Sequence, residues 1–76
     1  MRDRLLTIIN TVLTNRSNDP VSELNPEMNL RNDIGFDSMD LADLTVRIEA
    51  EFDVDIFEDG IVETVGEILE KLEAEA

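Results

Sequence analysis

The sequence predicts an all-α protein, a small bundle of three principal helices plus one short helix, with a long loop between the first two helices. Three observations predict this fold. Apolar residues recur at helical spacing in three segments, turn-forming residues end the first segment, and capping signals precede the other two. The chain has 76 residues, which is room for one domain, so we assign residues 1–76 to a single domain.

The first predicted helix spans residues 3–15. Its apolar side chains follow the spacing of one helix face: Leu5, Leu6, Ile8, Ile9, Val12 and Leu13. Residues 17–20 (Ser-Asn-Asp-Pro) are turn formers that end it. A loop of about 17 residues follows, and loops of this length in small domains are uncommon and often functional. Apolar residues recur along the loop and predict that it packs on the core: Val21, Leu24, Met28, Leu30 and Ile34.

A second helix is predicted from about Ser38 to Phe52. Four apolar residues at spacings of three and four lie on one of its faces: Leu41, Leu44, Ile48 and Phe52. Asp37 is the expected N-cap, and acidic residues at the helix start suit the positive end of the helix dipole. We expect Gly35 in a turn that requires a positive φ angle, and Phe36 in the core.

The last third of the chain predicts a short helical segment and then a longer helix. Residues 53–63 contain several apolar side chains, and Gly60 among them limits this segment to a single helical turn. Residues 64–67 (Thr-Val-Gly-Glu) match the Thr-x-x-Glu capping box that opens a helix. The apolar face of that helix is expected to hold four residues: Val65, Ile68, Leu69 and Leu72.

Charge is the most unusual property of the composition. The net charge is −13, and residues 37–76 hold fourteen acidic and two basic side chains, against five and four in residues 1–36. A polyanion repels phosphate backbones, so nucleic acid is not an expected partner, whereas proteins with basic surfaces are. The chain has no apolar run long enough for a membrane span and no signal-type segment. We therefore expect a soluble, cytoplasmic monomer.

The residue inventory argues against intrinsic enzyme activity. The chain contains no His, Cys, Tyr or Trp, so it lacks the usual general bases and thiol nucleophiles. The candidate bases near Ser38 are carboxylates, and carboxylates normally have pKa values near about 4, too low to activate a hydroxyl. Residues 53–57 begin like an EF-hand loop, but Phe57 stands where the third oxygen ligand belongs. We expect no dedicated metal site.

Residues 35–40 (Gly-Phe-Asp-Ser-Met-Asp) open the second predicted helix, and here the sequence resembles the acyl carrier protein family. The attachment site of that family contains Asp-Ser-Leu or Asp-Ser-Met after a glycine-containing loop. The resemblance extends to residues 25–35 before the site, to residues 48–52 at the end of the second helix and to residues 64–67 at the start of the last. It therefore covers nearly the whole chain.

The resemblance implies that Ser38 Oγ receives 4′-phosphopantetheine from coenzyme A, through a separate phosphopantetheinyl transferase that uses Mg²⁺. In the family the residue matching Asp37 also helps to engage the transferase and its metal. The implied further partners are acyl-activating enzymes, ketosynthases and acyltransferases of fatty-acid, polyketide or related lipid biosynthesis. The physics of the sequence agrees, because a phosphodiester on Ser38 would lie at a helix N-terminus, where backbone N–H groups favour negative charge.

Four residues of the second helix are candidates for partner binding. The residue matching Met39 contacts partners in the family, and Met39 lies off the apolar face, so we expect it to be partly exposed. Asp40, Asp43 and Glu49 are expected on the exposed side of the helix, where they would dock onto basic patches. Arg47 interrupts this acidic surface. It can pair at i, i+4 spacing with Asp43 before it or with Glu51 after it.

Two alternatives stay open on the sequence alone. A peptidyl or aminoacyl carrier protein shares the fold and the prosthetic group but carries amino acids, and the strong acidity favours an acyl carrier over it. A protein-interaction module would have no prosthetic group at all. Neither the pathway nor the length of the acyl chain follows from the sequence.

Overall fold

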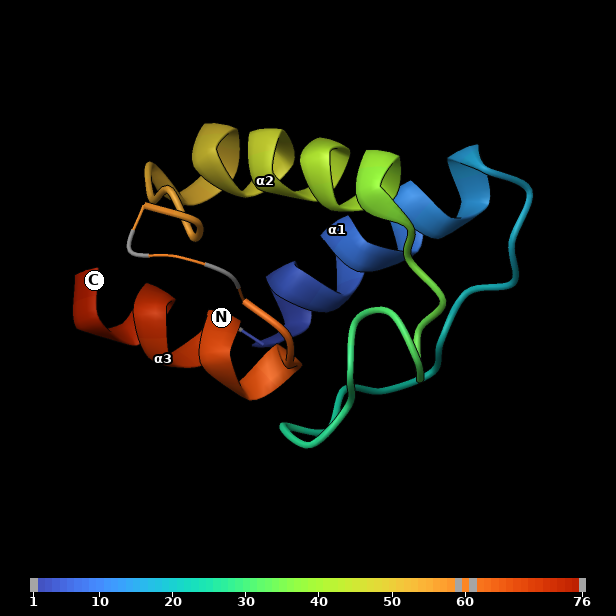
Figure 1. The fold of residues 1–76 in the computed structure, drawn as a ribbon, viewed down its shortest axis with the longest axis horizontal. Helices are drawn as coiled ribbons and strands as arrows, with labels where there is room; N and C mark the ends of the chain where they lie inside the picture. The colour runs from blue at the N-terminus through green and yellow to red at the C-terminus, as the bar shows by residue number, and fades with distance from the viewer. Residues whose placement is uncertain (1, 59, 61, 76) are drawn as a thin grey trace.

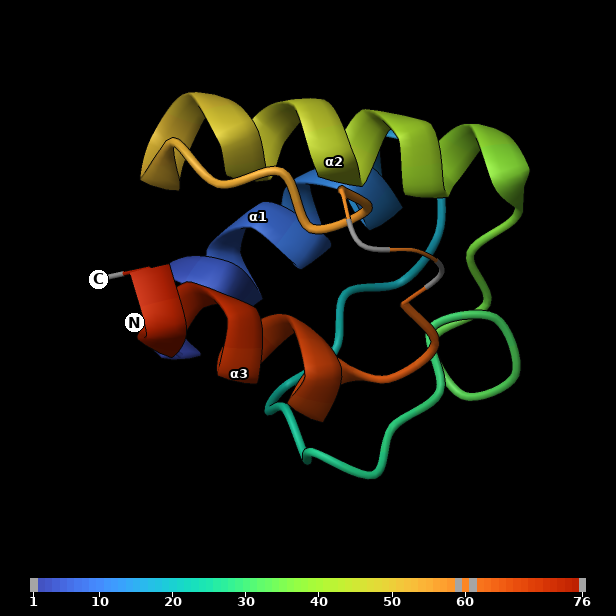
Figure 2. The same ribbon diagram turned by 60° about the vertical axis from the view of Figure 1, so that its left-hand side comes forward.

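The computed structural model describes residues 2–58, 60 and 62–75. Within these residues the chain forms three α-helices: α1 (Arg2–Asn15), α2 (Ser38–Phe52) and α3 (Val65–Glu75). Figure 1 shows that α1 runs in the opposite direction to α2 and α3, and Figure 2 shows the same arrangement after rotation. The all-α class and the three principal helices are confirmed. None of the helices in the described residues is both long enough and apolar enough to cross a membrane.

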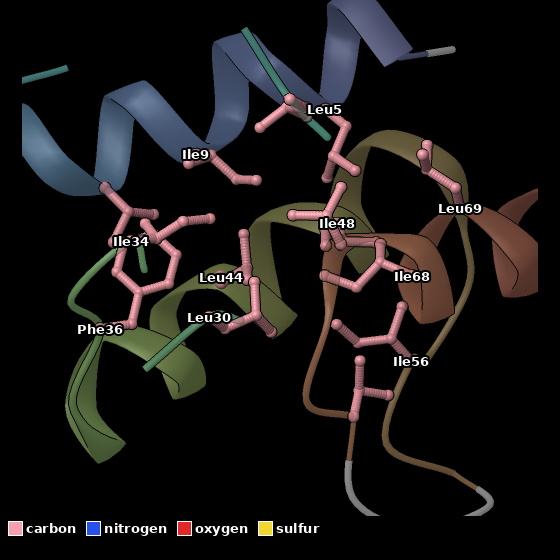
Figure 3. Close-up of a cluster of buried hydrophobic side chains, with 14 of the residues drawn as sticks. Leu5, Ile9, Leu30, Ile34, Phe36, Leu44, Ile48, Ile56, Ile68 and Leu69 are labelled. Atoms are coloured by element: carbon pink, nitrogen blue, oxygen red, sulfur yellow. The ribbon is translucent and has the colours of Figure 1, made fainter. Parts of the chain in front are cut away.

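One hydrophobic core lies between the three helices (Figure 3). The helices contribute buried side chains at the predicted spacing: Leu5, Ile9, Val12, Leu13, Leu44, Ile48, Val65, Ile68, Leu69 and Leu72. Both connecting segments contribute as well: Leu24, Leu30, Ile34, Phe36, Val54, Ile56 and Val62. Burial of each such side chain stabilises the fold by about 1.5–3 kcal/mol before the entropic cost of ordering the chain, so the loops are part of the core in energetic terms. The expectation that Phe36 is a core residue is confirmed.

The long connection between α1 and α2 is held on both sides. On the α1 side, the side-chain amide of Asn10 donates to the Val21 carbonyl oxygen at 2.9 Å and accepts from the Val21 N–H at 2.8 Å. Near α3, an isolated antiparallel bridge pairs Asn29 with Thr64. These bonds satisfy backbone groups that would otherwise lie unpaired in a half-buried loop. The connection is pinned to the core, as its apolar residues predicted.

The start of α3 explains one glycine of the predicted capping box. Thr64 Oγ1 accepts a hydrogen bond from the Glu67 N–H at 3.3 Å, which is the N-capping half of the box. The Gly66 N–H donates to the Pro26 carbonyl oxygen at 3.0 Å. A Cβ atom on Gly66 would lie 3.0 Å from that same oxygen, so the close approach of the loop to α3 favours glycine here.

The segment between α2 and α3 differs from its prediction. The described residues of 53–63 form turns in place of the expected short helix. Asp53 has φ 59° in the left-handed region and ends α2, and Gly60 has φ 133°, so both positions depart from helical geometry. Two residues of this segment, Asp59 and Ile61, lie outside the described part of the chain.

Candidate functional site

The site begins with the N-cap of α2. Asp37 has extended backbone angles, φ −96° and ψ −173°, and its Oδ1 accepts a hydrogen bond from the Asp40 N–H at 2.9 Å. In return, Asp40 Oδ2 accepts from the Asp37 N–H at 3.1 Å, which completes a capping box. The predicted N-cap is confirmed. The bond from the Asp40 N–H lowers the pKa of Asp37 below its usual value, and the positive charge of Arg16 lowers it further.

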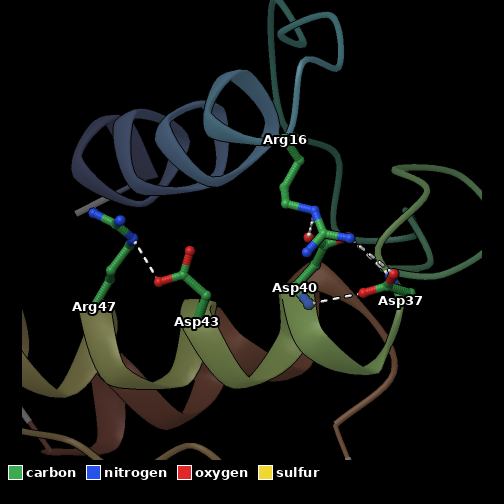
Figure 4. A network of polar contacts seen from close by, with 5 residues as sticks. All are labelled: Arg16, Asp37, Asp40, Asp43 and Arg47. Atoms are coloured by element: carbon green, nitrogen blue, oxygen red, sulfur yellow. Dashed lines mark hydrogen bonds and ion pairs between the residues drawn. The ribbon is translucent and has the colours of Figure 1, made fainter.

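Asp40 does not lie where the sequence analysis placed it. The expectation that it stands on the exposed side of α2 is wrong, because only 4% of the residue is exposed. Its carboxylate closes the capping box, and Oδ1 lies 3.3 Å from Arg16 Nε without the geometry of a hydrogen bond. Arg16 also reaches Asp37, with Nη2 at 3.3 Å from Oδ2 (Figure 4). Asp40 therefore belongs to the structure of the helix terminus, and we no longer assign it to a docking surface.

Ser38 is the first residue of α2, and its side chain is exposed. Arg31 approaches it from the loop, with Nη2 3.5 Å from Ser38 Oγ. The backbone at Arg31 is fixed locally, because Asn29 Oδ1 accepts from the N–H groups of Arg31 and Asn32, both at 2.9 Å. The Asn29 N–H in turn donates to Asp33 Oδ2 at 2.7 Å. A short hydrogen-bonded loop thus presents a guanidinium group to the serine hydroxyl.

Two residues connect this loop to α2. Gly35 has φ 93°, in the region that favours glycine, so the turn predicted there is confirmed. The Phe36 N–H donates to the Leu30 carbonyl oxygen at 2.9 Å, and the Phe36 side chain is buried. The turn brings the loop back beside the helix start, and the buried phenyl ring anchors it there.

A cavity of about 860 Å³ lies beside Ser38. Ser38 forms part of its wall, and Leu41, Ala42 and Thr45 continue that wall along α2. The opposite walls come from the loop at residues 29–32 and from the segment that precedes α3: Phe57, Val62 and Glu63. Its size is in the usual range for ligand pockets. The sequence analysis did not find this cavity or the contact of Arg31 with Ser38, because both depend on the path of the long loop.

The other candidate residues of α2 lie along its outer surface. Met39 is 69% exposed, in line with its expected exposure, and Glu49 is exposed as well. Asp43 is partly buried and accepts a hydrogen bond from Arg47 Nε at 2.9 Å, so Arg47 pairs with the acidic residue that precedes it (Figure 4). Val46 is 66% exposed, an apolar surface residue that the sequence analysis did not single out.

These residues fit a covalently attached phosphate-bearing group. Ser38 supplies an exposed hydroxyl at a helix N-terminus, Arg31 supplies a cation next to it, and the adjoining cavity has room for an attached chain. No group of three or more carboxylates that could hold a metal ion occurs among the described residues. The described residues thus place an exposed hydroxyl next to a guanidinium group at the start of α2.

Comparison with known proteins identifies the class. The family model for phosphopantetheine attachment sites matches residues 3–72, and proteins of this class bind 4′-phosphopantetheine covalently. The chain is 31% identical over 78 residues to an acyl carrier protein of Trieres chinensis, covering 100% of this chain and 98% of the relative. It is 43% identical over 54 residues to an acyl carrier protein of Amoebophilus asiaticus (strain 5a2), covering 68% of each. The chain belongs to the acyl carrier protein family.

The family membership bears on both alternatives. An interaction module without a prosthetic group does not fit the match to a phosphopantetheine attachment domain. An aminoacyl carrier has the same fold and group, but both relatives described above are acyl carrier proteins. The prosthetic group is 4′-phosphopantetheine, as the sequence resemblance implied.

Proposed function

We propose that Ser38 is the attachment residue and that the chain carries acyl groups as thioesters on the phosphopantetheine arm. The observation that supports this most directly is the exposed Ser38 hydroxyl at the first position of α2, on the wall of the large cavity. The thiol of the arm supplies a group that the chain itself lacks, since it contains no cysteine. Residues 1–76 would act as one acyl carrier domain.

Loading of the arm requires an external enzyme. The bond between Ser38 Oγ and phosphorus forms as the pyrophosphate bond of coenzyme A breaks. Adenosine 3′,5′-bisphosphate leaves, and the serine proton must pass to a base. No histidine or cysteine is present to accept it, so a phosphopantetheinyl transferase with Mg²⁺ would supply the base and the metal. Asp37 is the residue of this chain that would engage the transferase, because it directly precedes Ser38 and its side chain is exposed.

The cavity beside Ser38 is the proposed site for the acyl cargo. Leu41, Val62 and Phe57 give it apolar walls, and an acyl chain that enters it would be removed from water. A loaded acyl chain would then stabilise the fold, because it binds the native state and not the unfolded chain. The proposal does not fix a chain length or a pathway.

Partner enzymes would dock on the outer surface of α2. Met39 offers an adaptable apolar contact, and Glu49 and Asp43 offer negative charge to basic patches. The partners we propose are the transferase, acyl-activating enzymes, ketosynthases and acyltransferases. Monomeric state and cytoplasmic location stay predictions of the sequence, as does the absence of intrinsic enzyme activity.

Intact mass spectrometry tests the attachment residue. After incubation with coenzyme A, Mg²⁺ and a broad-specificity phosphopantetheinyl transferase, the wild-type chain should gain the mass of one phosphopantetheinyl group. Ser38→Ala should gain none, a complete loss of modification, because its acceptor oxygen is gone. Ser22→Ala, a matched change at an exposed loop serine, should behave as wild type. Modification of Ser38→Ala would place the arm on another residue and refute the assignment.

A further inference from the structure

Arg31 contacts Ser38, the proposed attachment residue. Among the described residues, no carboxylate lies within ion-pair distance of its guanidinium group. Its Nη2 lies 3.5 Å from Ser38 Oγ, a contact between a cation and a neutral hydroxyl. We propose that Arg31 binds the phosphodiester that forms on Ser38 and holds the start of the arm against the loop at residues 29–32. This inference rests on the proposed function, because it requires the arm to be on Ser38.

Within the described ranges, three of the other four arginines pair with carboxylates, and Arg31 does not. Arg4, Arg16 and Arg47 each have a carboxylate oxygen within 4 Å, and in the described part of the chain Arg31 has none. A guanidinium group forms its strongest hydrogen bonds with anionic oxygens, and its planar fork matches phosphate geometry. A phosphodiester on Ser38 would be the first anionic partner of Arg31.

The backbone of the loop holds Arg31 in this position in advance. Asn29 accepts hydrogen bonds from the N–H groups of Arg31 and Asn32, and the buried side chains of Leu30 and Ile34 fix the loop on either side. Within this loop, the freedom lost on binding an anion is therefore mainly that of the Arg31 side chain. A smaller entropic cost leaves more of the interaction energy for binding.

Part of the hydrogen-bonding capacity of the helix terminus is already used within the chain. The sequence analysis expected backbone N–H groups at the start of α2 to favour the phosphodiester. The Asp37 carboxylate already accepts from the Asp40 N–H, and the Leu41 N–H is used by the Asp37 carbonyl oxygen at 3.0 Å. Asp37 also places a negative charge next to the phosphodiester, which raises the free energy of the modified form. Arg31 supplies both a donor and the compensating positive charge.

Nuclear magnetic resonance of the modified protein tests this contact directly. Wild type, Arg31→Gln and Arg47→Gln are each converted to the phosphopantetheinylated form, with conversion verified by intact mass and folding by circular dichroism. Arg47→Gln is the matched control, because it removes the same charge from a residue whose partner is Asp43. The ³¹P resonance of the phosphodiester should shift in Arg31→Gln and stay at the wild-type position in Arg47→Gln. Arg31→Lys, which keeps the charge without the fork, should give an intermediate shift.

Two further readouts make the test independent of any variant. In wild type, the side-chain Nε–H signal of Arg31 should move between the unmodified and the modified form. The difference in the Arg31 Nε–H chemical shift between the two forms should decrease as NaCl is raised from about 10 mM to about 1 M. Over that range the screening length falls from about 30 Å to about 3 Å. Coincident ³¹P resonances in wild type and Arg31→Gln at low salt, with an unmoved Arg31 signal, would refute the contact. Absence of the mass gain in wild type would instead refute the proposed function, and this inference with it.

Discussion

The two ends of α2 are built differently. At its C-terminal end, Arg4 from α1 donates from Nε to Glu51 Oε1 at 2.9 Å, and its guanidinium carbon lies 4.7 Å from the centre of the Phe52 ring. At its N-terminal end, Ser38 is exposed beside a large cavity and Arg31 meets only its hydroxyl. At one end, Arg4 is paired within the chain, whereas at the other an exposed hydroxyl, an arginine without a carboxylate partner in the described chain and a cavity lie side by side.

The backbone at the N-terminal end of α2 is nevertheless held by side-chain contacts. Asp37 and Asp40 cap each other, and Arg16 lies within 3.3 Å of a carboxylate oxygen of each. This network fixes the backbone at the start of α2, where Ser38 is the first residue. On the proposed function, this fixed helix start would hold the Ser38 backbone in place for a transferase.

Replacement of the buried acid tests this comparison with the largest expected effect. Asp40→Ala removes half of the capping box and the contact with Arg16, so we expect a loss of about 1–2 kcal/mol in the free energy of unfolding. In a domain of this size each kcal/mol corresponds to about 4–8 °C in melting temperature. Thermal unfolding followed by circular dichroism at 222 nm measures it.

Asp43→Ala is the matched control for that experiment. It removes only the half-exposed pair with Arg47, worth about 0.3–0.5 kcal/mol. Equal melting temperatures for the Asp40 and Asp43 variants would mean that Asp40 has no special structural role. That result would contradict the assignment of Asp40 to the structure of the helix terminus.

A smaller effect is expected at the opposite end of α2. Arg4→Ala removes the pair with Glu51 and the contact with the Phe52 ring, both at exposed or half-exposed positions. We expect a loss of about 0.5–1 kcal/mol, because solvent screens such contacts. Modification of Ser38 should proceed at the wild-type rate, which a coenzyme A assay can measure. A slowed modification would show that the two ends are coupled and would break the comparison.

The smallest expected effect is the contribution of Asp37 to the stability of the fold at acidic pH. The pKa of Asp37 is lower in the folded chain than in the unfolded one, mainly because the Asp40 N–H donates to its carboxylate. Its contribution to stability is therefore fully present above the unfolded pKa of about 4 and is lost as the pH falls through the folded pKa. Asp37→Asn should lower the melting temperature at pH 7, and the difference from wild type should narrow below about pH 4. A difference that is constant with pH would exclude this ionisation as its source.

Local signals were enough to predict α2 and its cap. Its bounds, Ser38–Phe52, follow from the N-cap residue Asp37 and from the periodic apolar face that begins four residues later at Leu41. The burial of Asp40 was missed, although Asp-x-x-Asp at positions 37–40 places a second acid at the N3 position of a capping box. The presence of Arg16 above it could not be predicted, since that contact joins residues far apart in the sequence.

Tertiary contacts account for the rest of what the sequence analysis missed. The cavity beside Ser38 exists because the loop at residues 29–32 and the segment before α3 stand away from α2, and no periodic pattern reports the distance between loops. The approach of Arg31 to Ser38 depends on the turn at Gly35, whose positive φ was predicted but whose direction was not. In place of the expected short helix, Asp53 ends α2 in a left-handed conformation, and the Glu58 N–H donates to the Asp55 carbonyl oxygen at 3.3 Å in a turn.

Localisation of the arm within the chain tests the central claim most directly. The modified wild-type protein is digested with a protease, and tandem mass spectrometry assigns the phosphopantetheinyl group to a residue. The account predicts that the group is found on Ser38 alone, the exposed first residue of α2. A phosphopantetheinyl group on any other serine or threonine, with Ser38 unmodified, would contradict it and would leave the open end of α2 without the role proposed here.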